Sequence, residues 1–186
     1  MKTFLILVCM CLVCAAAVTV IGQGKQTDSN EQLIERKYDR FKDETTVRLK
    51  PQLIIDSKSP RQVLEMSAKT AFKGEHLTES DEMVEITFIS SGKLYRDPAE
   101  LNFIVEKERV KGGPAITGNP YNPEKPLATD LRTAQNIRAS ISFDTLRKIT
   151  SGKTVQMQLE STELALDTAT LSNLRKFASV IFGKDK

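Results

Sequence analysis

Hydrophobic and polar residues alternate along much of this chain with a period of two, which is the pattern of half-buried β-strands. In residues 155–160, for example, Val155, Met157 and Leu159 alternate with two glutamines and a glutamate. Short turns between such stretches favour antiparallel pairing. The stretches with this pattern are 47–55, 64–72, 84–88, 101–105, 137–143, 155–160 and 164–166.

Two stretches change to the helical period. A short helix is predicted after Asp144, whose carboxylate can cap it, with Gly152 expected in the left-handed conformation at its end. A longer helix is predicted from Thr170 as N-cap towards the end of the chain. Its apolar stripe must be buried against the strands, and consists of Leu171, Leu174, Phe177, Ala178 and Ile181.

These elements together predict a single α+β domain over residues 38–186. Its expected form is a mostly antiparallel sheet of about seven strands, with a short helix and a C-terminal amphipathic helix packed on it. Pro51 should break its strand or place it at an edge. Residues 112–126 hold three glycines and four prolines, so we expect a loop without regular structure there. A hairpin through Glu106 is suggested, although Gly, Asn and Asp are missing from its turn.

The first 22 residues have the pattern of a secretory signal peptide. Lys2 precedes an uncharged apolar run to Ile21, and cleavage is expected before Gln23, with Ala15 to Ala17 as an alternative site. An uncleaved membrane anchor is a second possibility, because the run is near the minimum length for a spanning helix. A lipoprotein is disfavoured, because bulky Val13 precedes Cys14. The polar segment 23–37 is predicted to be a tether.

Composition narrows the possible functions. All three cysteines lie in the leader, so the exported chain should have neither disulfides nor cysteine metal sites. The 27 basic and 24 acidic residues are mixed along the sequence, which is atypical of nucleic-acid binders. We expect contact with a membrane only if the leader is retained. No cofactor is predicted, and the expected location is periplasmic or extracellular.

One histidine, His76, lies in a charged loop with Glu79 and Asp81. These three residues are weak candidates for a divalent metal site or a hydrolytic centre, since their spacing matches no defined motif. A solvated loop between strands is the favoured interpretation. No catalytic residue is assigned.

A second candidate site is the loop around Tyr121. The tyrosine lies between Asn119-Pro120 and Asn122-Pro123, and a tyrosine on a proline-stiffened loop loses little entropy on binding. Asn119, Tyr121 and Asn122 are therefore candidate contacts for a ligand or partner. An ordinary connecting loop is the competing interpretation.

Several fold-determining positions resemble a type of small exported bacterial α+β domain that has no established function. The resemblance covers the chain after the leader and implies no activity and no site residues. It rests on the segments Tyr38-Asp39-Arg40-Phe41, Thr45-Thr46-Val47, Phe72-x-Gly74, Phe143-x-x-Leu146-x-x-Ile149, Leu164-x-Leu166 and Leu174-Arg175.

The sequence therefore predicts an exported binding or structural module of the cell envelope without catalytic activity. Its partner would be another envelope protein, or a small apolar ligand held between the sheet and the last helix. The alternative is a secreted hydrolase that uses the loop carboxylates with His76.

Overall fold

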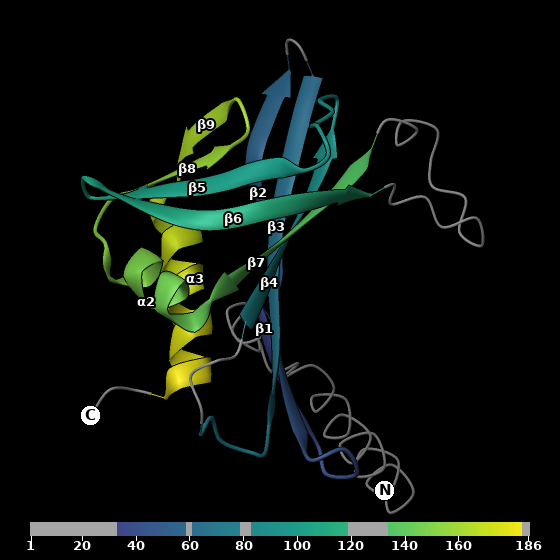
Figure 1. Ribbon diagram of the computed structural model, residues 1–186, viewed down its shortest axis with the longest axis vertical. Coiled ribbons are helices and arrows are strands. Elements are labelled where there is room, and N and C mark those ends of the chain that lie inside the picture. The colour runs from purple at the N-terminus through teal and green to yellow at the C-terminus, as the bar shows by residue number, and fades with distance from the viewer. Residues whose placement is uncertain (1–32, 59–60, 79–82, 119–133, 184–186) are drawn as a thin grey trace, which may run out of the picture. The chain divides into compact units, whose positions relative to one another are not determined.

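The computed structural model describes residues 33–58, 61–78, 83–118 and 134–183, which belong to one unit, Leu33–Lys186. The described part of this unit is mainly β, with two helices (Figure 1). In chain order the elements are β1 (Ile34–Asp39), β2 (Glu44–Lys58), β3 (Arg61–Lys73), β4 (Met83–Ser91), β5 (Ala99–Val105), β6 (Glu108–Gly118), β7 (Gln135–Ser142), α2 (Phe143–Ser151), β8 (Val155–Leu159), β9 (Thr162–Ala165) and α3 (Thr168–Phe182).

The strands form one antiparallel sheet of nine strands in the order β1-β2-β3-β4-β7-β6-β5-β8-β9. The sheet is strongly curled, so that β5, β6 and β8 run across the direction of β2, β3 and β4, as in a half-barrel (Figure 1). Within the described residues, β1 and β9 are its two edges. The predicted antiparallel sheet with two helices is confirmed, but it has nine strands in place of about seven.

The two helices lie on the inner face of the curled sheet. Helix α3 packs against β2, β1 and α2, and α2 packs against the strands from β4 to β7. The predicted apolar stripe of α3 is buried, with Phe177 fully so. Other fully buried side chains, including Phe88, Phe103 and Phe143, fill the space between sheet and helices. Burial of these large apolar groups is the main stabilising contribution.

Strand β6 corrects the first part of the predicted irregular loop over 112–126, whereas residues 119–126 lie outside the described residues. Residues 112–118 are part of β6, which pairs with both β5 and β7. Gly112 fits because a Cβ there would lie 2.8 Å from the Leu101 side chain. Gly113 takes a φ of +86° beside a shift in the β5–β6 register. Pro114 precedes the first β6 residue that pairs with β7, so its missing N–H leaves that ladder intact.

The N-terminal boundary and the proline strand also differ in detail from expectation. Strand β1 begins at Ile34, inside the segment predicted as a tether, because residues from Ile34 on find a partner in β2. Pro51 does interrupt its strand, since the β2–β3 register shifts between Leu49 and Gln52. It does not mark an edge strand, because β2 lies between β1 and β3.

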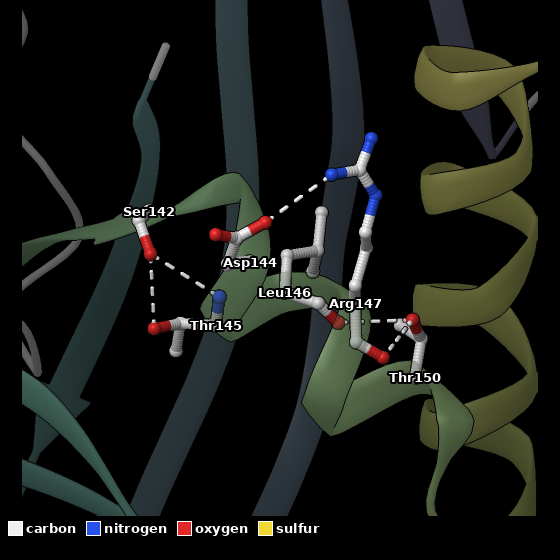
Figure 2. Close-up of polar contacts among 6 residues, drawn as sticks. All are labelled: Ser142, Asp144, Thr145, Leu146, Arg147 and Thr150. Carbon is white, nitrogen blue, oxygen red and sulfur yellow. Dashed lines mark hydrogen bonds and ion pairs between the residues drawn. The ribbon is translucent and has the colours of Figure 1, made fainter. Parts of the chain in front are cut away.

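Both helices begin earlier than predicted. Ser142, not Asp144, caps α2, and its hydroxyl accepts a hydrogen bond from the Thr145 amide at 3.2 Å. Figure 2 shows this cap beside Asp144, which instead pairs with Arg147 at 3.2 Å. For α3, Asp167 accepts from the amide of Thr170 at 2.7 Å, so Asp167 is the N-cap. In both cases the actual cap lies two or three residues earlier, at the last extended residue.

Gly152 ends α2, but with a φ of −69°, so the predicted left-handed conformation is wrong. Glycine is required there for space, because a Cβ would collide with the side chain of Val105. The β5–β6 hairpin is present despite its unfavourable turn sequence, with Glu106 at a φ of +58°. Its carboxylate accepts hydrogen bonds from the amides of Lys153 and Thr154. These bonds lower the pKa of Glu106.

Candidate functional site

A depression of about 330 Å³ lies on the outer face of the sheet, over β5, β8 and β9 with the start of β6. This is the face opposite the helices, because Phe103 and Met157 point inward and are buried, and successive side chains along a strand point to opposite faces. Of the outward residues, Asn102 is only 8% exposed. The β5–β8 register brings outward residues together that lie more than 50 positions apart in sequence, such as Asn102 and Gln158. The residues that line it with outward side chains are Asn102, Ile104, Arg109, Gln156, Gln158 and Glu163.

These side chains form two rows across the strands. In one row, Asn102 of β5 lies opposite Gln158 of β8, which lies opposite Glu163 of β9. In the other, Arg109 of β6 lies opposite Ile104 of β5, which lies opposite Gln156. One row is thus entirely polar, and the other has an apolar centre.

Hydrogen bonding fixes part of this arrangement. The amide nitrogen of Gln158 donates to the Glu163 carboxylate at 2.9 Å, which orients the Gln158 oxygen and the carboxylate as acceptors. The three carboxamides add further donors and acceptors. Ile104 is 42% exposed and supplies an apolar contact. Arg109 and Glu163 balance each other in charge. The depression therefore favours a neutral or zwitterionic polar group over an anion or cation.

A polar cluster connects the β8–β9 turn to the segment between β4 and β5. The Tyr95 hydroxyl lies 3.0 Å from the Thr162 hydroxyl. Lys93 also donates to Thr162 and lies 5.1 Å from the centre of the Tyr95 ring. Burial raises the pKa of the Tyr95 phenol. The backbone of Tyr95 is bound twice by the Gln135 side chain, at 2.7 and 2.9 Å. These contacts hold the beginning of β9 in place.

His76 is exposed and follows the end of β3. It borders hollows of about 420 and 290 Å³, together with Glu75 and, in the second, Arg36 and Phe182. Glu79 and Asp81 lie outside the described residues, so the structure does not test whether they join His76. In the part that is described, no three His, Cys, Asp or Glu side chains form a group that could hold a metal ion.

A groove of about 440 Å³ between α2 and α3 contains Arg147 and Arg175. Both arginines already have partners. Arg175 donates to the carbonyls of Thr150 and Gly152 at the end of α2, at 3.0 and 2.6 Å. Arg147 pairs with Asp144 (Figure 2). Its guanidinium carbon also lies 4.2 Å from the centre of the Phe182 ring. The Asp144 carboxylate offsets the charge of Arg147, and the carbonyls at the C-terminal end of α2 stabilise the charge of Arg175.

The candidate contacts Asn119, Tyr121 and Asn122 also lie outside the described residues, and they stay a prediction. Neither described helix is long and apolar enough to cross a membrane. Comparison of the chain with protein-family models, with curated proteins and with solved structures finds no match.

The depression was missed at the level of sequence because its members come from four strands. Gln156 and Gln158 gave a local signal, since both lie in the polar row of one strand. That signal gains meaning only once β8 is seen to pair with β5.

Proposed function

We propose that this chain is an exported binding module without catalytic activity, and that it binds a protein partner at the outer depression over β5, β8 and β9. The observation that carries the proposal is the concentration of three carboxamides, one arginine, one glutamate and an exposed isoleucine in one hollow. Carboxamides donate and accept hydrogen bonds but do not titrate near neutral pH. They suit recognition better than acid–base chemistry.

A protein partner fits this hollow better than the other ligand classes expected from the sequence. The space beneath α3 is filled by buried side chains such as Phe88 and Phe177, which supports an external site over one for an apolar ligand. A volume of about 330 Å³ is at the small end for ligand pockets. It can hold one or two side chains of a partner, with Ile104 as an apolar anchor.

The test is selection of binding peptides. A displayed library of random dodecapeptides would be selected on the chain from Gln23 onward, and the affinity of the enriched peptides measured by calorimetry. Gln158→Leu keeps the size of the side chain but removes its hydrogen bonds. It should weaken binding about tenfold, because the Glu163 carboxylate and the partner both lose a contact.

The matched control is Arg48→Ala, on the outer face of β2 and outside the depression, which should leave the affinity within about twofold. The proposal fails if no peptide is enriched, or if the enriched peptides bind Gln158→Leu and wild type equally.

A further inference from the structure

The open edge of β9 adjoins the depression directly. Glu163, Leu164 and Ala165 of this strand all line the hollow, and within the described residues no strand pairs with β9 on its other side. A molecule in the depression therefore lies against a row of strand backbone.

The register shows which backbone groups face outward. The Leu166 amide donates to the Val155 carbonyl at 2.9 Å, so the pair formed by these two residues is hydrogen bonded. Bonded and non-bonded pairs alternate along an antiparallel ladder. Leu164 and Thr162 are then bonded to β8, and the N–H and C=O groups of Glu163 and Ala165 point to the open edge.

The opposite edge of the sheet is less suited to addition of a strand. In β1 the consecutive residues Glu35, Arg36 and Lys37 are all charged and exposed. Charged side chains on an edge strand oppose pairing with another chain. Strand β9 has one charged residue, Glu163, and its carboxylate is held by Gln158 on the outer face.

We infer that the partner binds as an extended segment that adds a strand to β9 and places one of its side chains in the depression. The inference rests on the proposed function and names the kind of partner. The outward N–H and C=O groups of Glu163 and Ala165 have the spacing of an unpaired strand backbone. The backbone of another strand can form hydrogen bonds with both kinds of group. Hydrogen bonds between the two backbones then provide affinity. The carboxamide side chains of the depression and Ile104 determine which side chain of the partner is accepted.

The decisive variant is Ala165→Pro, which removes one outward N–H and places a ring at the open edge. We expect the selected peptides to bind it about tenfold more weakly than wild type. The matched control is Arg36→Pro, which makes the same backbone change at the open edge of β1 and should stay within about threefold of wild type.

If Ala165→Pro does not fold, a chain with an ester in place of the Ala165 amide, made by ligation of a synthetic C-terminal segment, deletes only the N–H and should give the same loss. A peptide that is sensitive to Gln158→Leu but binds the proline or ester chain like wild type overturns strand addition and leaves the binding function standing. Insensitivity to all of these changes overturns both.

Discussion

The two edge strands of this sheet differ in the features that prevent wrong pairing with other chains. Strand β1 has six residues, with an exposed charged run, and is supported by α3. Strand β9 has four residues with one charge, and a polar hollow lies beside it on the outer face. An edge strand in a soluble protein must be short, charged or covered to avoid wrong pairing. Charge protects β1 against wrong pairing, whereas β9 is short and can add the strand of a specific partner.

The largest predicted effect concerns the support that α3 gives to the β1 edge of the sheet. Phe177→Ala removes a fully buried ring from α3, the helix that packs against β1 and β2. It should lower the free energy of unfolding by about 3–5 kcal/mol, as measured by urea titration. Limited proteolysis of the folded variant should cut first near β1 and later near β9. Initial cleavage within β9 would contradict this difference in support.

The next effect comes from exchanging the chemistry of the edges. Glu163→Lys together with Ala165→Glu gives β9 a charged sequence like that of β1, and should weaken the selected peptides about tenfold. The melting temperature should change little, because both side chains are exposed.

The reciprocal exchange is Glu35→Thr with Lys37→Thr, which removes two charges from β1 and should promote self-association in sedimentation experiments. A monomeric β1 variant, combined with unchanged peptide binding to the charged β9 variant, would show that charge does not distinguish the edges.

The smallest effect concerns the contact that holds β9. Tyr95→Phe removes the hydroxyl near Thr162 and should lower the stability by about 1 kcal/mol. Because burial raises the pKa of Tyr95, its neutral form stabilises the fold fully below the ordinary pKa of 10.0. That contribution is lost as the pH rises from there through the raised pKa. Wild type should therefore lose more stability than Tyr95→Phe above pH 10 in alkaline melts, and equal losses would contradict this role.

Local patterns correctly predicted the elements in which the apolar row or stripe of the sequence is the side that is buried. The alternation of β3, β4, β7 and β8, and the stripe of α3, gave their inward faces correctly because each buries one row of side chains. The second half of strand β6, residues 112–118, was missed because its glycines and Pro114 signal a loop. They fit a strand only where Leu101 requires space and a register shift absorbs the extra residue.

The candidate site was less accessible to prediction than the fold. The polar rows of β5 and β8 are visible in the sequence, but the pairing of Asn102 with Gln158 joins positions far apart along the chain. The position of β9 at an edge depends on the order of all nine strands. Neither the pairing nor the edge position can be predicted from the local hydrophobic periodicity. The hollow and the open edge beside it are therefore found only in the three-dimensional structure.

The most direct test is amide hydrogen exchange, residue by residue, with and without a saturating selected peptide. Exchange at Glu163 and Ala165 should slow about tenfold or more when the peptide binds, since both amides gain a partner. Exchange at Arg36, on the open edge of β1, should stay unchanged. Saturating binding that leaves Glu163 and Ala165 exchanging at their free rates would contradict strand addition at β9.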